Sequence, residues 1–174
     1  SIGLVGVNGS GKSTLLKIAA GVMESEGGEI QRSNELRIGY LPQNPEYDPE
    51  LTVIEQAMKY SDGRTEEYLV KSLLTRVHMN DYDKKMGELS GGQRKRVALA
   101  SLFAPETNLL ILDEPTNHMD NDIIEWMEAY LQSYKGAVFM ITHDRYFLER
   151  ITNNIWEIEK GKLVCYEGNY EAYL

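Results

Sequence analysis

The chain alternates between short apolar runs and longer segments in which apolar residues recur every three or four positions. The runs at 2–5, 109–112 and 137–141 are apolar almost throughout, as expected for strands buried in a parallel sheet. Residues 36–41 alternate between apolar and polar positions, which predicts a further strand that ends at Pro42. These patterns favour an α/β fold with a mainly parallel sheet core flanked by helices.

Two weaker patterns extend the set of predicted strands. Residues 29–32, with the sequence Glu-Ile-Gln-Arg, follow a polar loop that contains glycines and are a short strand candidate. Residues 155–158 and 162–165 are separated by a glycine-containing turn, so they predict a small β-hairpin near the end of the chain.

Helical spacing of apolar residues predicts helices at residues 14–20, 51–59, 65–78, 94–103 and 123–131. Thr52 can cap the second of these helices, and Asp62-Gly63 separates it from the third. Because no strand lies between the helices at 51–59 and 65–78, we expect a small helical lobe, which we place at approximately 44–103.

Length and composition narrow the class of protein. A chain of 174 residues is one domain by the usual size range. Its 18 basic and 27 acidic residues give a net charge of −9, which argues against binding nucleic acid by overall attraction. The single cysteine, Cys165, cannot form an internal disulfide, and no apolar run approaches the roughly 18 residues of a membrane span. We therefore expect a cytoplasmic protein without membrane insertion, truncated at its N-terminus because the first strand begins at once.

The segment after the first strand, residues 6–13, matches G-x-x-x-x-G-K-[ST] at every fixed position. It lies between a predicted strand and a predicted helix, which is the context this motif requires. Glycines let backbone N–H groups converge on an anion, and the helix that begins at Lys12 adds the positive end of its dipole. Lys12 should reach the β- and γ-phosphates of a nucleotide, and the Ser13 hydroxyl should ligate Mg²⁺. The nucleotide-binding residues expected from the motif are Gly6, Asn8, Gly9, Ser10, Gly11, Lys12, Ser13 and Thr14.

Polar residues follow the buried strands at the edge where the carboxyl ends of parallel strands meet. Asp113 and Glu114 come directly after residues 109–112. Asp113 is the expected Mg²⁺ partner, and Glu114 is placed to orient and deprotonate an attacking water. His143, in the sequence Thr-His-Asp after residues 137–141, is expected to contact the γ-phosphate at the same edge.

Two further segments carry candidate chemistry. Gln43 lies on the loop after the strand at 36–41. Residues 89–93, Leu-Ser-Gly-Gly-Gln, open the helix at 94–103, and a helix that begins with Ser-Gly-Gly is a second anion site. This second site lies too far along the chain to belong to the first loop. His78 and His118 have no comparable support, and we assign His78 to the surface.

The loop at 6–13, Gln43, residues 89–93, residues 109–114 and His143 occur in the order and spacing of an ATP-binding-cassette (ABC) nucleotide-binding domain, which the chain resembles over nearly its whole length. The resemblance implies a P-loop NTPase fold of the ABC type and one nucleotide-binding domain over residues 1–174. It also implies an ATPase that uses ATP and Mg²⁺ and that is weak as an isolated cassette.

The same resemblance assigns roles to individual residues. Gln43 would be the Q-loop residue that ligates Mg²⁺ and takes part in catalysis, Glu114 the catalytic glutamate and His143 the switch histidine, while Asp120 would lie in the D-loop. Metal ligands would be Ser13, Gln43 and Asp113. In this family the signature acts in trans on the nucleotide of a second cassette, and here it would comprise Leu89, Ser90, Gly91, Gly92 and Gln93.

Three segments resemble subfamily F, the tandem-cassette proteins that act on ribosomes. They are Asn-His-Met-Asp at 117–120, in which Met119 departs from the usual Leu, Thr-His-Asp-Arg-Tyr-Phe-Leu at 142–148, and the terminal segment 166–174. The resemblance implies the first cassette of a tandem translation or antibiotic-resistance factor, with the ribosome bound through other regions. A nucleotide-binding subunit of a membrane transporter and a repair or chromosome-type cassette stay open as alternatives.

Overall fold

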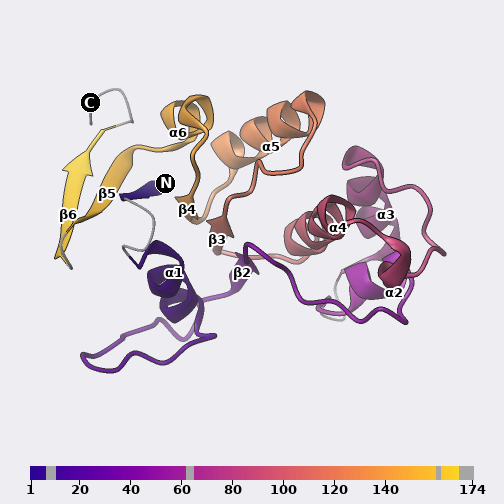
Figure 1. Ribbon diagram of the computed structural model, residues 1–174, viewed down its shortest axis with the longest axis horizontal. Coiled ribbons are helices and arrows are strands. Elements are labelled where there is room, and N and C mark those ends of the chain that lie inside the picture. Colours follow the sequence, from indigo (N-terminus) through magenta and orange to yellow (C-terminus); the bar gives the residue numbers. More distant parts are fainter. Residues whose placement is uncertain (7–10, 62–64, 160–161, 169–174) are drawn as a thin grey trace. The chain divides into compact units, whose positions relative to one another are not determined.

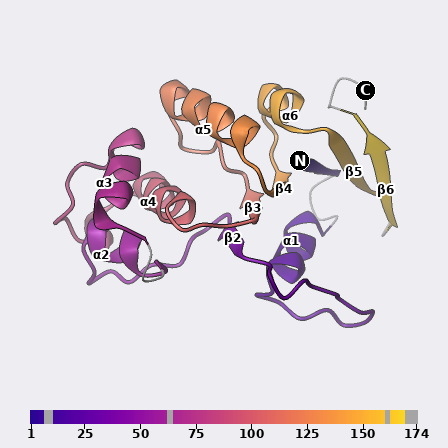
Figure 2. The same ribbon diagram turned by 180° about the vertical axis from the view of Figure 1, so that it is seen from behind.

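The computed structural model describes residues 1–6, 11–61, 65–159 and 162–168 (Figures 1 and 2). Within it the chain separates into two compact units, which we describe one at a time. The first, the sheet unit, comprises residues 1–42, 107–115 and 127–174, and the second, the helical unit, comprises residues 43–106 and 116–126. The glycine at the predicted helix break Asp62-Gly63 and the terminal residues 169–174 lie outside the described residues.

The sheet unit contains a six-stranded sheet with the order β2-β3-β4-β1-β5-β6. All neighbouring pairs are parallel except β5 and β6, which form the predicted hairpin. The fold is therefore α/β with a mainly parallel sheet, as predicted. The strands are β1 (Ile2–Gly6), β2 (Ile38–Leu41), β3 (Leu109–Asp113), β4 (Ala137–Ile141), β5 (Asn154–Glu159) and β6 (Lys162–Glu167).

The register of the parallel strands brings the ends of β3 and β4 to one level. Asp113 pairs with Ile141, so the residues that follow both strands emerge side by side at the same edge of the sheet. Strand β1 lies on the other side of β4, with Leu4 opposite Ile141. This order explains why the polar residues after three separate strands gather at one edge.

Helices cover both faces of this sheet (Figures 1 and 2). Helix α1 (Lys12–Ala20) begins after Gly11 at φ 94°, a left-handed conformation that favours glycine, and packs Leu16 against Leu4 and Ile111 of the sheet. Helix α6 (Arg145–Ile151) lies on the opposite face, where a Cβ added to Gly3 would meet Leu148 at 2.7 Å. Apolar periodicity did not predict α6, because the helix is only 7 residues long.

The prediction of a strand at 29–32 is wrong. The segment has no regular structure, and Ile30 is 43% exposed. A strand requires a neighbour to satisfy its backbone groups, whereas here Arg32 donates a 2.7 Å hydrogen bond to the Ile18 carbonyl near the end of α1. The segment therefore caps a helix instead of extending the sheet.

The helical unit packs α2 (Val53–Met58), α3 (Glu67–Arg76) and α4 (Gly91–Phe103) together, with a short 3₁₀ helix, η1 (Met86–Glu88), before α4. The first residues of α5 (Asn121–Ser133) also belong to it. Thr52 caps α2 as predicted: its hydroxyl accepts from the Glu55 amide, and Glu55 accepts from the Thr52 amide. Hydrogen bonds from the side chain and the backbone N–H of Thr52 lower the pKa of the Glu55 carboxyl, because they favour its charged form. The core of the unit includes Val53, Ala57, Val70, Leu74, Val97 and Ala100.

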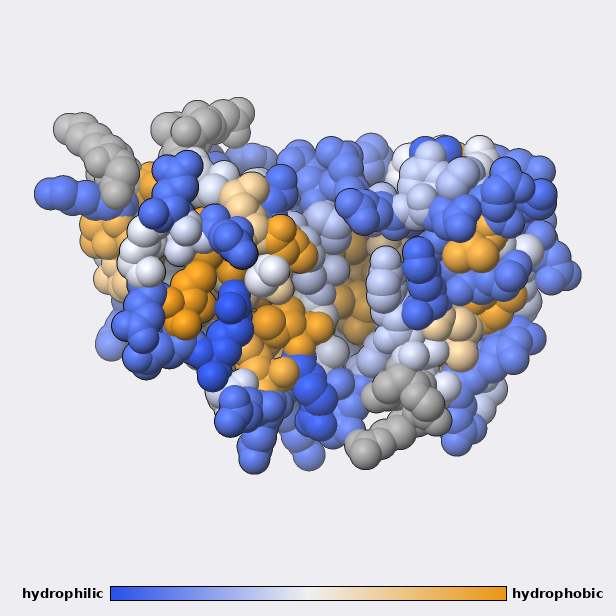
Figure 3. Space-filling view, turned by 90° about the horizontal axis from the view of Figure 1, so that it is seen from below, coloured by the Kyte–Doolittle hydropathy of each residue, from blue (hydrophilic) through white to orange (hydrophobic). Residues whose placement is uncertain are grey.

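The face drawn in Figure 3 is mainly hydrophilic and carries separate apolar patches. Exposed apolar side chains of the sheet unit include Val22, Met23 and Ile30. Among the described residues, no helix has the length and apolar character needed to cross a membrane.

Candidate functional site

The end of β3 and the start of α1 bring together two predicted metal ligands. The Ser13 hydroxyl donates a 2.9 Å hydrogen bond to Oδ2 of Asp113, whose side chain is only 2% exposed. The two residues are 100 positions apart in the sequence, so only the fold makes them neighbours. A hydroxyl and a carboxylate are hard oxygen donors of the kind Mg²⁺ prefers, and this pair fits that cation.

The negative charge of Asp113 also influences a neighbouring strand. Burial raises the pKa of the Tyr40 phenol, and the Asp113 carboxylate raises it further. Both effects keep the Tyr40 phenol neutral at physiological pH.

Glu114 and His143 form the second pair at this edge. His143 Nε2 lies 3.2 Å from Glu114 Oε1, and the His143 backbone N–H donates to Glu114 Oε2 at 3.3 Å. The Glu114 side chain is 7% exposed, whereas that of His143 is 70% exposed. The carboxylate is therefore held from two directions, while the imidazole stays accessible to a ligand.

The backbone of Glu114 has an unusual conformation. Its φ is 51°, in the left-handed region that residues with a side chain rarely adopt. A 2.7 Å hydrogen bond from its N–H to the Ile141 carbonyl holds it there. Strained backbone of this kind is concentrated at functional sites, since the surrounding structure must stabilise it.

A cavity of about 330 Å³ opens beside the ends of β1 and β4. Its lining includes Gly6, Lys12, Thr142, His143 and Arg145. The volume is at the lower end of the range of small-molecule sites, and cationic Lys12 and Arg145 make it suitable for an anion such as phosphate. Lys12 is 9% exposed and its ammonium donates to the Gly6 carbonyl.

The structure places only part of the predicted phosphate loop. Gly6 and Lys12 line the cavity, Gly11 is the N-cap of α1, Ser13 lies in the first turn of this helix, and Thr14 is an exposed residue of it. Asn8, Gly9 and Ser10 lie outside the described residues. Arg145 was not predicted as a site residue, although Asp144, which accepts a hydrogen bond from the Phe147 amide, is a recognisable helix cap directly before it.

The signature segment forms the start of α4 in the helical unit. Ser90 is the N-cap: its hydroxyl oxygen accepts from the Gln93 amide at 3.2 Å, and the Gln93 side chain accepts from the Ser90 amide at 2.9 Å. Leu89 is 4% exposed and anchors the segment in the core. Ser90 and Gly91 are exposed, and a Cβ on Gly91 would meet nothing within 4 Å, so the helix start is open to a ligand or partner.

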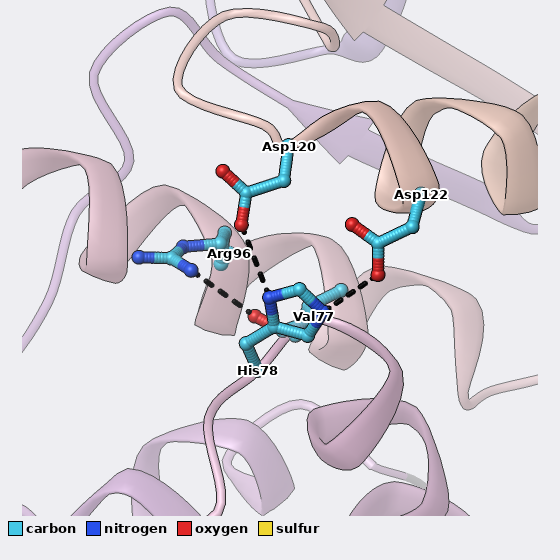
Figure 4. A network of polar contacts seen from close by, with 5 residues as sticks. All are labelled: Val77, His78, Arg96, Asp120 and Asp122. Carbon is cyan, nitrogen blue, oxygen red and sulfur yellow. Dashed lines mark hydrogen bonds and ion pairs between the residues drawn. The ribbon is translucent and has the colours of Figure 1, made fainter.

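Two other predicted residues also lie in the helical unit. Gln43 is exposed on the loop that follows β2, as its position in the sequence predicted. Asp120 is exposed, and its carbonyl accepts from the Ile124 amide at the start of α5. Its carboxylate contacts His78, which is exposed as predicted and whose ring bridges Asp120 and Asp122 (Figure 4).

Comparisons with known proteins all find ABC proteins or proteins related to them. A model of the ABC transporter family matches residues 1–117. The chain is 43% identical over 213 residues to the "Uncharacterized ABC transporter ATP-binding protein YfmR" of Bacillus subtilis (strain 168), covering 99% of this chain and 34% of that protein. It is 37% identical over 214 residues to the "Energy-dependent translational throttle protein EttA" of Escherichia coli (strain K12), covering 99% of this chain and 39% of that protein.

A solved structure supports the same grouping. The chain is 28% identical, with a TM-score of 0.79, to a chain in the complex of archaeal ribosomal stalk protein aP1 and archaeal ribosome recycling factor aABCE1. The match covers 99% of this chain and 35% of that one. The chain thus spans little more than a third of the length of the relatives that it matches.

Proposed function

Because the chain belongs to the ABC transporter family of ATP-binding domains, we propose that it is the ATP-hydrolysing cassette of a ribosome-associated translation or antibiotic-resistance factor of subfamily F. In this proposal it is the first cassette of a tandem and forms one nucleotide-binding domain over residues 1–174, with a helical lobe at about 44–103. The observation that carries the ATPase part is the meeting of Ser13, Asp113, Glu114 and His143 at one edge of the sheet.

These residues divide the reaction between them. The Lys12 ammonium binds the β- and γ-phosphates of ATP, and the exposed imidazole of His143 contacts the γ-phosphate. Glu114 orients a water molecule and accepts its proton as the water oxygen attacks the γ-phosphorus. Ser13 and Asp113 would hold Mg²⁺, which supplies charge neutralisation to the phosphates when bound. Products are ADP and phosphate.

The ribosomal part of the proposal rests on likeness. Residues 117–120 and 142–148 resemble subfamily F, EttA is named as a translational throttle, and the solved relative is part of a complex of a ribosomal stalk protein and a recycling factor. A transporter subunit is the competing function, since the YfmR relative is described as an ABC transporter ATP-binding protein.

Ribosome co-sedimentation of the full-length protein tests the proposal. We expect recovery in the ribosome pellet with a non-hydrolysable ATP analogue and little recovery with ADP, because ATP closes paired cassettes. Lys12→Ala, which removes a phosphate contact, should abolish the difference. Equal recovery with both nucleotides, or association with membrane vesicles instead of ribosomes, would favour the transporter function.

The exposed start of α4 leads to a prediction about a composite site. By family resemblance, the amides after Ser90 complete the γ-phosphate site of the second cassette. Ser90→Arg should therefore lower hydrolysis at that second nucleotide by about 10²-fold or more, while ATP binding at the Lys12 site is kept. Single-turnover hydrolysis and equilibrium ATP binding on the tandem protein measure the two effects separately.

Two further measurements test the composite site: a control variant of the tandem protein and the isolated chain. Ser72→Arg makes the same change at an exposed position of α3 and should leave both measurements unchanged. The isolated chain, kept monomeric as judged by light scattering, should hydrolyse ATP slowly. A monomer that turns over as fast per site as the tandem protein contradicts the composite site.

A further inference from the structure

Helix α3 ends in a conformation that normally requires glycine. His78 has φ 62°, its N–H donates to the Thr75 carbonyl at 3.1 Å, and the N–H of Met79 donates to the Leu74 carbonyl at 2.8 Å. This is the Schellman arrangement, in which the left-handed position is usually occupied by glycine because a Cβ is disfavoured there. A histidine at this position strains the backbone, and the left-handed conformation fixes the direction in which its side chain leaves the helix end.

The ring of His78 joins the carboxylate of Asp120, directly before α5, to that of Asp122 in the first turn of α5 (Figure 4). Nδ1 lies 3.1 Å from Asp120 Oδ2, and Nε2 lies 2.7 Å from Asp122 Oδ2. Both nitrogens can donate only when the ring carries two protons, so an imidazolium satisfies both carboxylates at once. The three groups also lie within 4.8 Å of one another, but each ring nitrogen is already engaged with a different carboxylate, so the arrangement requires no cation.

Within the helical unit, the end of α3 and the loop at 116–120 each contact the signature helix α4. Arg96 of α4 donates from Nη1 to the Val77 carbonyl at 3.5 Å, directly before His78. In addition, a Cβ added to Gly92 would lie 3.0 Å from the Cβ of His118, so the loop rests against the start of α4. His78 is therefore the link that joins Asp120, through the end of α3, to the helix that carries Ser90.

We propose that His78 is a positioning residue that holds the loop at 116–120 in register with the signature helix, so that both meet the second cassette as one preassembled surface. The inference rests on the proposed function, because Asp120 and Ser90 contribute to a second cassette only in a paired ATPase. His78 itself touches neither nucleotide nor water in this proposal. Its effect passes through Asp120.

Replacing His78 with glycine separates this role from a structural one. Glycine suits the left-handed position, so the midpoint of thermal unfolding should stay the same or rise. Loss of the two contacts should nevertheless increase amide hydrogen exchange at 116–120 by about three- to tenfold and lower kcat for ATP by a similar factor, with KM unchanged. Both measurements use the full-length protein, and the exchange experiment is repeated with EDTA, which should change nothing.

A second variant and a control complete the test. Asp122→Asn removes the charge of one of the two partners of His78, at a residue that we do not place in the catalytic machinery. It should increase exchange at 116–120 and lower kcat by smaller factors than His78→Gly. Lys85→Gln breaks an exposed ion pair with Glu50 in the same unit and should leave exchange at 116–120 unaltered. Unchanged loop exchange or unchanged kcat in His78→Gly, or loss of protection in EDTA, overturns the proposal. Absence of ATPase activity in the wild type would instead refute the proposed function, while the exchange result stays interpretable.

Discussion

Glu114→Gln should lower ATP turnover by about 10²–10⁴-fold while leaving ATP affinity unchanged. Glutamine keeps the size of the side chain, and its amide oxygen can still accept one of the two hydrogen bonds from His143, but it cannot take a proton from water. Because glutamine has nearly the same shape as glutamate, the substitution should leave the packing around this buried side chain nearly unchanged, and a loss of turnover would report on proton transfer. Steady-state ATPase rates and equilibrium ATP binding on the full-length protein give the two quantities.

The same variant connects hydrolysis to the ribosome. If turnover ends the closed state, Glu114→Gln with ATP should accumulate that state and increase recovery with ribosomes relative to the wild type. Glu125→Gln, at an exposed position of α5, is the matched control and should behave as the wild type. Full turnover in Glu114→Gln would remove Glu114 as the general base, and equal ribosome recovery would count against the translation-factor proposal.

Lys12→Ala should weaken ATP binding at least tenfold. The ammonium lies at the start of α1 beside the cavity, where it can form charge-assisted hydrogen bonds to phosphate that contribute on the order of 1.5–3 kcal/mol each. Lys12 is nearly buried, so few waters would replace a lost contact. Titration calorimetry with ATP and Mg²⁺ on the full-length protein, at the site of this cassette, measures the loss.

A second lysine on the same helix provides the control. Lys17 is exposed in the last turn of α1, away from the helix start, and Lys17→Ala should leave ATP affinity unchanged. Unchanged affinity in Lys12→Ala would show that the loop at 6–13 does not hold the phosphates of this nucleotide. Equal losses in both variants would indicate a general electrostatic effect instead of a specific contact.

Local patterns in the sequence were sufficient to predict much of the sheet unit. Strands β3 and β4 are continuous apolar runs, and a parallel strand places the residue after it at one edge of the sheet whatever the strand order is. For this reason Asp113, Glu114 and His143 could be predicted at one edge of the sheet before the order β3-β4-β1 was known. The Thr52 cap likewise depends only on residues within one helical turn.

Other features depended on partners that no local pattern contains. Residues 29–32 have the composition of a strand but no strand to pair with, and the left-handed Glu114 depends on a bond to Ile141 from another strand. Helix α6 is too short for periodicity and is defined by its cap and its packing on the sheet.

By itself the sequence determined the α/β class, most of the strands and helices and the residues that follow β3 and β4, because periodicity, caps and the phosphate-loop motif are encoded within a few residues of one another. The tertiary structure alone decided which distant side chains meet. His78 joins Asp120 across 42 positions, and the Glu114 N–H donates to the Ile141 carbonyl of another strand. Such pairs carry no signal in a single sequence, since their energy arises only after the packing of separate elements has brought the two side chains within hydrogen-bond distance.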